Sequence, residues 1–462
     1  MLSVEENKLL MEVGPGTPMG NLMRRYWQPV AAVEELNEHP TKQIRLMGED
    51  LVIYKDKSGT YGVLDLHCPH RRADLSYGMV EDCGLRCNYH GWAFNENGDC
   101  IDQPFENIAH PDANFKDKVK TKSYKLEAKA GLLWVYMGPD PVPCLWDWDA
   151  YHFVGYKQIT FSNIACNWLQ CAENDIDPVH FEWLHTNWSE DLSGRRDPDG
   201  QPIPTHLQIG FDEFEWGIFY RRILEGDAEW VAGRVALWPN CLMPGGAHFE
   251  WRVPVDDYNT LSVSWTLDVL PGDEPFEQEK IPYWWSPVVD DRTGRWINSN
   301  TVNQDIIAWV GQGVQSDRQN EHLGESDRGV IMMRQRLLKD IKVVEDGGDP
   351  KGILRDESRN YALSLRPGGQ GYSYPAVEPS FAPGRDPAVM RTQAEVRRQQ
   401  LFASLSGNGT EGRRRRGSAA NLFFGQPDWI ADEYERIYDE RLAKLPEEKR
   451  SSVPVLPSAA SD

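Results

Sequence analysis

Two Cys/His pairs are the first feature of the sequence with an evident chemical use. Cys68 and His70 lie in the segment HCPHRRADL, and Cys87 and His90 lie in LRCNYHGWAF. The pattern is Cys-x-His, a spacer of 16 residues, and Cys-x-x-His. Two thiolates and two imidazoles on two short loops can hold a tetrahedral zinc ion or a two-iron cluster. The spacing alone leaves both metals open.

The residues beside these ligands narrow the choice. Arg71 directly follows the first histidine, and Gly91-Trp92 follows the second. With these neighbours the two loops resemble the Rieske box of the Rieske non-haem iron oxygenases, and zinc becomes the weaker alternative. The resemblance implies a [2Fe-2S] cluster with two cysteines on the buried iron and two histidines on the outer one. These ligands are Cys68 and Cys87, and His70 and His90.

The remaining cysteines have no evident ligand role. Rieske proteins of respiratory chains carry an extra cysteine in each cluster loop, which forms a disulfide, and neither loop here has one at that place. Cys83 and Cys100 are therefore expected to be ordinary thiols. The first residues, MLSVEENKLL, lack the basic and apolar regions of a signal peptide, and we expect a cytoplasmic protein without a disulfide framework.

A second group of possible ligands lies in NWLQCAENDIDPVHFEWLH, residues 167–185. Asp177, His180 and His185 form the pattern Asp-x-x-His-x₄-His. Two imidazoles and one carboxylate can bind Fe(II) and leave positions open for O₂ and substrate. Residues five apart are about 140° apart on an ideal α-helix, so both histidines reach one metal only if the helix is distorted or ends between them. Asp177-Pro178 looks like a helix start, which predicts a break near 175–178.

The roles within this group follow only from the family resemblance. By itself, a pair of histidines on an aromatic-rich helix could equally belong to the core. The resemblance makes His180 and His185 the ligands of a mononuclear iron. It makes Asp177 a bridge that hydrogen-bonds one of them and a Rieske histidine, His70 or His90, of a neighbouring subunit. Asn174 either lies near this iron or holds the helix break.

The carboxylate ligand must come from elsewhere in the chain. Asp305, in NQDIIAWVGQGVQSDR, resembles the family's downstream iron ligand. Asp317, Glu321 and Asp327 are its competitors.

The pattern of elements predicts an α+β protein. We expect helix over most of residues 1–25, an all-β Rieske domain at 26–145 and a catalytic domain at 146–345. The latter has strands at Phe211 to Ile223, Trp230 to Leu237 and Leu261 to Val269, with helices near 166–186, from Gln304 to Trp309 and from Glu321 to Leu338. Helices on an antiparallel sheet fit the helix-grip, START-like fold that the resemblance implies. Residues 346–462 form a C-terminal extension with an irregular segment at 365–386, four arginines at 413–416, a helix from Asp428 to Leu442 and a partly disordered tail.

Composition indicates a folded protein and argues against nucleic-acid binding and against a membrane-spanning helix. Hydrophobic residues make up 40% of the 462-residue chain, which is enough for sizeable cores. The net charge of -22 disfavours nucleic-acid binding. No apolar run approaches the roughly 20 residues of a membrane span.

Longer segments resemble the phthalate-dioxygenase-like group of this family. They are VGPGTPMGNLMRRYWQPV and EHLGESDRGVIMMRQRL, and CAENDIDPVHFEWLH is most similar to the aromatic O-demethylases. Pro178 replaces the serine of the phthalate enzyme, which weakens phthalate as the substrate. An aromatic, carboxylated or methoxylated compound is expected instead, oxidised by O-demethylation, by hydroxylation or by cis-dihydroxylation.

The resemblance also implies partners. Electrons would come from NAD(P)H through a separate reductase or ferredoxin, and the oxygenase would form a homotrimer or hexamer. A non-enzymatic Rieske electron carrier is the alternative from another class, although it needs only the first motif. Four arginines could pair with a substrate carboxylate, although such residues more often form surface ion pairs: Arg221, Arg222, Arg234 and Arg252.

Overall fold

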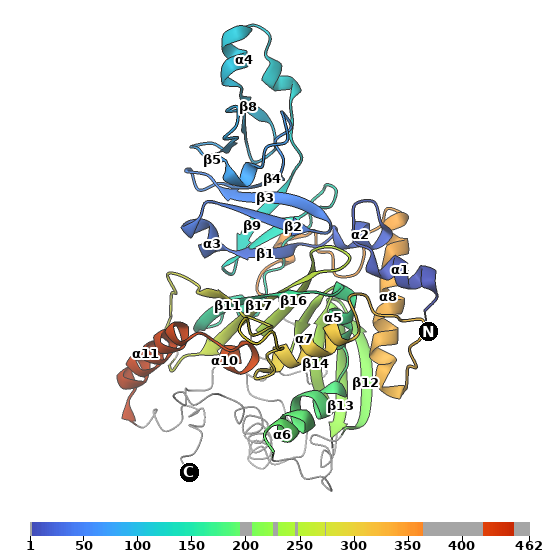
Figure 1. Ribbon diagram of the computed structural model, residues 1–462. Coiled ribbons are helices and arrows are strands. Elements are labelled where there is room, and N and C mark those ends of the chain that lie inside the picture. Colours follow the sequence, from blue (N-terminus) through green and yellow to red (C-terminus); the bar gives the residue numbers. More distant parts are fainter. Residues whose placement is uncertain are drawn as a thin grey trace.

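The computed structural model describes residues 2–194, 206–224, 230–244, 248–272, 274–363 and 419–447. Figure 1 shows two lobes, one with two small sheets and one with a large sheet and most of the helices. The expected irregular segment at 365–386, the arginine run at 413–416 and the tail after residue 447 lie outside the described residues. In the described ranges, no helix has the length and apolar character needed to cross a bilayer.

The first lobe is all-β apart from short helical turns, as the sequence predicts. Its six-stranded antiparallel sheet has the order β1-β10-β9-β4-β3-β2. The bounds are Gln28–Ala32, Leu132–Tyr136, Ser123–Lys129, Tyr61–Asp65, Glu49–Lys55 and Thr41–Leu46. A four-stranded sheet follows, with β5 Met79–Val80, β6 Leu85–Arg86, β7 Ala93–Phe94 and β8 Cys100–Asp102. The short helices are α3 Val33–Glu38, η1 Leu75–Tyr77, α4 Pro104–Ala109 and η2 Phe115–Lys118.

The second lobe contains an eight-stranded sheet in the order β12-β13-β14-β15-β16-β17-β11-β18. The bounds are His206–Phe214, Gly217–Leu224, Val231–Leu237, Cys241–Met243, His248–Pro254, Thr260–Val269, Gly155–Ile164 and Tyr283–Trp285. Every pair of neighbours is antiparallel except β11 and β18, which are parallel. The expected antiparallel sheet therefore gains one parallel edge strand.

The strand expected from Phe211 to Ile223 is wrong, because it is a hairpin of two strands. Phe214 pairs with Gly217, so Glu215 and Trp216 form a two-residue turn between β12 and β13. Neither turn residue is the glycine or asparagine on which sequence recognition of such turns depends.

Helices cover the large sheet and join the lobes (Figure 1). The N-terminal helical region is two short helices, α1 Val4–Met11 and α2 Pro18–Met23, and Ser3 and Glu6 form the expected capping box. The second lobe has η3 Asp149–His152, α5 Trp168–Asn174, the π-helix η4 Phe181–Asn187, α6 Trp188–Leu192, α7 Thr301–Gly311, η5 Glu325–Asp327, α8 Arg328–Glu345 and η6 Glu357–Arg359. The helix expected from Glu321 therefore starts seven residues later. The C-terminal helices are α10 Ala419–Phe424 and α11 Asp428–Lys444.

The two lobes share one core. The ring of Trp134, on β10, lies 5.1 Å from that of Trp251, on β16, in an edge-to-face contact. Both side chains belong to a single cluster of buried apolar residues that also includes Leu22 and Leu337. The six-stranded and eight-stranded sheets are thus held in a fixed relation by packed side chains, whereas Cys68 and Cys87 belong to a separate group of buried residues.

Candidate metal centres

The two cysteine-bearing loops have the same backbone. In each loop the cysteine N–H donates to the carbonyl five residues later, which is that of Ala73 for Cys68 and that of Trp92 for Cys87. The cysteine carbonyl accepts from the N–H four residues later, which is that of Arg72 for Cys68 and that of Gly91 for Cys87. The fourth residue is left-handed in both, with φ of 61° at Arg72 and 76° at Gly91. Two matching turns therefore face one another, and each presents one thiol and one imidazole.

The four side chains divide by burial. Cys68 and Cys87 are 1% and 2% exposed, whereas His70 and His90 are half-buried with ring centroids 4.5 Å apart. His70 also stacks on Trp92 at 4.3 Å. Burial, with a further contribution from Cys87, raises the pKa of the Cys68 thiol to about 12. A bound metal would be needed to keep that sulfur ionised, so an inner thiolate pair and an outer imidazole pair fit a two-iron cluster.

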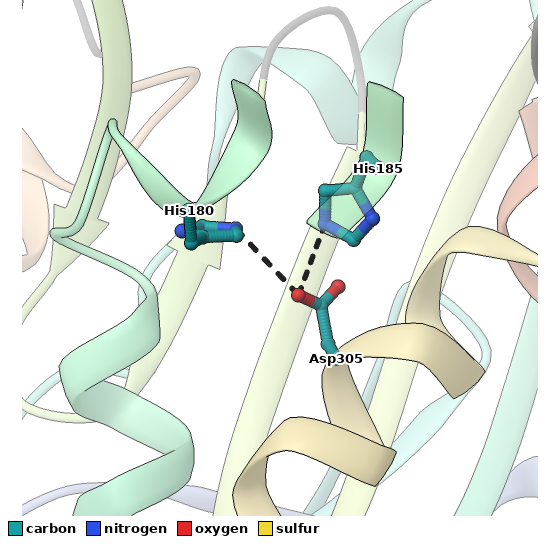
Figure 2. Close-up of side chains that lie close together, drawn as sticks. All are labelled: His180, His185 and Asp305. Atoms are coloured by element: carbon teal, nitrogen blue, oxygen red, sulfur yellow. Dashed lines mark ion pairs between the residues drawn. The ribbon is translucent and has the colours of Figure 1, made fainter. Parts of the chain in front are cut away.

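A second donor set lies in the second lobe, between η4 and α7. Figure 2 shows His180 and His185 pointing toward Asp305. Asp305 Oδ1 is 3.0 Å from His185 Nε2 and 3.6 Å from His180 Nε2, and one donor atom from each residue lies within 4.8 Å of the others. Among the described residues, both ring nitrogens of His180 and Nε2 of His185 are buried without a hydrogen bond. Such orphaned nitrogens around a carboxylate fit a metal ion.

The π-helix explains how histidines five residues apart reach one point. The chain leaves α5 at Asn174, breaks through residues 175–179 and resumes as η4. The π-helix repeats with i→i+5 hydrogen bonds, so residues five apart lie close to one face. The rings of His180 and His185 are 5.3 Å apart. The predicted distortion and the predicted break near 175–178 are both present.

Asp177 and Asn174 lie beside these donors. Asp177 Oδ1 accepts from the Val179 N–H at 2.8 Å, as a cap does, and its Oδ2 is 3.6 Å from His180 Nδ1. Burial opposes ionisation, but the nearby imidazole of His180 and the backbone N–H groups of Val179 and His180 outweigh it and hold the pKa of Asp177 below its ordinary value. Asn174 Nδ2 donates to Asp305 Oδ1 at 3.3 Å. Asn174 thus lies near the candidate metal and also ends α5.

The three competing carboxylates have other partners. Asp317 accepts from Asn320, Glu321 pairs with Arg334, and Asp327 accepts from the Gly324 N–H. Asp305 is 6% exposed, and although burial opposes its ionisation, His185 and His180 hold its pKa below the ordinary value.

Gln304 is a site residue that the sequence interpretation missed. Its Oε1 lies 3.0 Å from His185 Nδ1, and its Nε2 donates to Ser189 Oγ at 2.9 Å and to the Asn298 carbonyl at 3.2 Å. The sequence feature that could have identified Gln304 is its position directly before Asp305. The structure places both residues on the buried first part of α7.

Comparison with known proteins agrees with both centres. Residues 26–120 match the family model of the Rieske [2Fe-2S] domain. The chain is 51% identical over 371 residues to the 5,5'-dehydrodivanillate O-demethylase oxygenase subunit of Sphingobium sp., covering 79% of this chain and 86% of that protein. This chain is a Rieske non-haem iron oxygenase. The expected similarity to an O-demethylase of this kind is confirmed.

Two further relatives show the range of this oxygenase family. The phthalate 4,5-dioxygenase oxygenase subunit of Pseudomonas putida is 32% identical over 401 residues, covering 75% of this chain and 88% of that protein. The tert-butanol monooxygenase / tert-amyl alcohol desaturase oxygenase subunit of Aquincola tertiaricarbonis is 35% identical over 378 residues, covering 74% and 78%. The chain is therefore an enzyme that uses a Rieske cluster and a mononuclear iron, and the zinc and electron-carrier alternatives are rejected.

Proposed function

We propose that this oxygenase removes a methyl group from a methoxylated aromatic carboxylate, with cis-dihydroxylation as the alternative reaction. The observation that carries the proposal is the 51% identity to an O-demethylase over most of both chains. The names of other relatives, phenoxybenzoate dioxygenase and phthalate 4,5-dioxygenase, also refer to aromatic carboxylates. Because both of these relatives are dioxygenases, cis-dihydroxylation is kept as the alternative reaction.

We assign the residues as follows. His180, His185 and Asp305 would bind the mononuclear iron, and Cys68, His70, Cys87 and His90 the cluster. The iron supplies O₂ activation with electrons delivered through the cluster. The protein's own part is to hold His185 through Gln304, to place Asn174 against Asp305 and to keep the donor set buried.

Demethylation balances with one O₂ and two electrons. Hydroxylation of the methyl carbon consumes one oxygen atom, and the other leaves as water with two protons. The hydroxymethyl ether then loses its C–O bond, the phenol oxygen takes the proton, and formaldehyde departs. A dioxygenase would instead retain both oxygen atoms in its product.

We also propose that Asp177 relays electrons between subunits of a homotrimer or hexamer. The cluster loops and the α5–α7 region lie in opposite lobes (Figure 1), which favours transfer across a subunit interface over transfer within one chain. We also propose the division of the chain into four parts: an N-terminal helical region at 1–25, a Rieske domain at 26–145, a catalytic domain at 146–345 and a C-terminal extension at 346–462. The reductase or ferredoxin that supplies NAD(P)H electrons and the cytoplasmic location stay predictions.

Product analysis with a surrogate reductase tests the reaction. We expect formaldehyde and a phenol from 5,5'-dehydrodivanillate in equal amounts. Formation of a cis-dihydrodiol without formaldehyde would contradict demethylation and support the dioxygenase alternative.

Asp305→Ala should lose the mononuclear iron, so that the iron content falls from about three to about two per chain, while the visible Rieske spectrum persists. Asp317→Ala is the matched control and should keep all its iron.

A further inference from the structure

The inner side of the large sheet carries buried polar side chains next to the mononuclear site. His248, Glu250 and Arg252 alternate along β16 and are 4%, 3% and 1% exposed. Alternate residues of a strand point to one face. Asp175, which ends α5, lies 3.5 Å from Arg252, and the Trp309 ring of α7 lies 4.6 Å from the same guanidinium. This face is therefore turned toward the helices that border the iron site.

Three of the four candidate arginines already have partners. Arg221 donates to Asp212 at 2.7 Å, and its side chain is 40% exposed. Arg222 lies 3.4 Å from His206 Nε2. Arg252 donates to Glu250 at 2.6 Å and to Ser262 at 2.9 Å. A substrate group could reach these guanidinium groups only by breaking existing contacts.

Arg234, on β14, differs from them. It is half-buried, and its guanidinium carbon lies 5.1 Å from the ring centroid of Phe181, whose ring is 5.4 Å from that of His185. Yet within the described ranges it makes no hydrogen bond and no ion pair. A half-buried guanidinium whose donors are not engaged by the protein can bind an anion without first breaking an existing contact.

We propose that Arg234 binds a carboxylate of the substrate and thereby makes the enzyme prefer anionic over neutral aromatic compounds. This inference rests on the proposed function, because the carboxylate must be bound while the methoxy group faces the iron. The planar guanidinium fits a carboxylate through two parallel hydrogen bonds. Bound Fe(II) adds two positive charges nearby, which further favours an anion over a neutral ligand. The phenyl ring of Phe423, 5.0 Å from His248, supplies apolar surface on the same side of the sheet.

Calorimetry on the iron-loaded enzyme without O₂ tests the proposal. The probes are 5,5'-dehydrodivanillate and its diamide, which has the same shape without the charges. The wild-type enzyme should bind the dicarboxylate at least about tenfold more tightly. Arg234→Gln should weaken dicarboxylate binding about 10–100-fold and leave diamide binding unchanged, since charged hydrogen bonds are worth that much. Arg234→Lys should fall between, because lysine keeps the charge without the planar fork.

Arg221→Gln, on the neighbouring strand, is the matched control and should leave both affinities unchanged. Iron content and the visible spectrum of each variant must equal those of the wild type. The inference is overturned if the wild-type enzyme does not prefer the dicarboxylate, or if Arg234→Gln weakens both ligands equally. These outcomes differ from failure of the proposed function, which would appear as an iron-loaded wild-type enzyme that releases no formaldehyde.

Discussion

At the scale of single residues, the amide of Gln304 decides which nitrogen of His185 is available to a metal. Its Nε2 donates to Ser189 and Asn298, so its Oε1 must face His185 Nδ1. Nδ1 therefore carries the proton, and Nε2 keeps its lone pair directed toward Asp305 (Figure 2). The imidazole is held in its metal-binding tautomer before any metal arrives.

Replacing this amide tests its role. Gln304→Leu keeps the side-chain size but removes the acceptor, so His185 loses its fixed tautomer and orientation. We expect iron affinity at the mononuclear site to fall about 10–100-fold while the Rieske spectrum is unchanged. Anaerobic iron titration measures the change. Gln312→Leu, at the exposed end of the same helix, is the control, and equal affinities for the two variants would contradict the role.

The metal-site residues were more predictable than their supports. Spacing and residue type singled out the cysteines and the histidines as possible metal donors, because donor chemistry restricts ligands to a few residue types. Their assignment to iron, and the choice of Asp305 among four carboxylates, came from the family resemblance. Gln304 could not be chosen in this way, since its partner His185 lies 119 positions earlier and most glutamines are exposed. Likewise, the sequence offered four equivalent arginines, and only their surroundings distinguish Arg234.

At the scale of elements, one buried carboxylate ties three helices together next to the proposed iron ligands. Glu173, on α5, accepts from Arg318 at 2.8 Å and from Arg334, on α8, at 2.6 Å. Arg318 is fully buried and also donates to Asn7, on α1. The helix that leads into the π-helix is therefore fixed by charged hydrogen bonds as well as by packing.

Glu173→Gln should destabilise the fold by about 3–5 kcal/mol, because it leaves two buried guanidinium groups short of negative charge. Burial opposes ionisation of Glu173, but both arginines outweigh it and hold its pKa below the ordinary 4.5. Its stabilisation is thus complete above about pH 4.5 and is lost as the pH falls through the folded-state pKa. Urea unfolding at several pH values measures both effects.

The exposed pair Arg436–Glu440 supplies the control. Glu440→Gln should change the free energy of unfolding by less than about 0.5 kcal/mol. A Glu173→Gln protein with the same stability and the same acid response as this control would show that the buried network contributes nothing.

Element boundaries were predicted where the sequence marks them and missed where it does not. Ser3 with Glu6 marks the start of α1, and Asp177-Pro178 marks the break before η4. The β12–β13 turn carries no such signal. The parallel pairing of β18 with β11 depends on residues more than 100 positions apart, so strand pattern alone cannot show it.

At the scale of the whole molecule, the distance between the two centres demands a route for electrons. Asp177 has a side chain that is 28% exposed, and it contacts His180. This half-buried carboxylate beside a proposed iron ligand has the exposure that the proposed electron relay to a neighbouring subunit requires.

Asp177→Asn should keep both centres but slow reoxidation of the reduced cluster about 10–100-fold when substrate and O₂ are added. Single-turnover absorbance of the Rieske centre measures the rate. Asp191→Asn, an exposed position in α6, should reoxidise at the wild-type rate. A normal rate for Asp177→Asn would place the electron path elsewhere.

The position of the C-terminal helices has a consequence for biosynthesis. Phe424 and Ile430 pack in one core with Val302 and Ile306, on the helix that carries Asp305, and the Phe424 carbonyl accepts from Ser286. The Rieske sheet, by contrast, is built entirely from strands between residues 28 and 136. Its strand pairs, and the core around the two cysteine-bearing loops, use only residues of that range and can form while the ribosome is still translating the rest. The face that packs on β16 forms later, and the core next to the catalytic iron is complete only once α10 and α11 have emerged. Assembly of the iron–sulfur cluster can therefore precede loading of the catalytic iron.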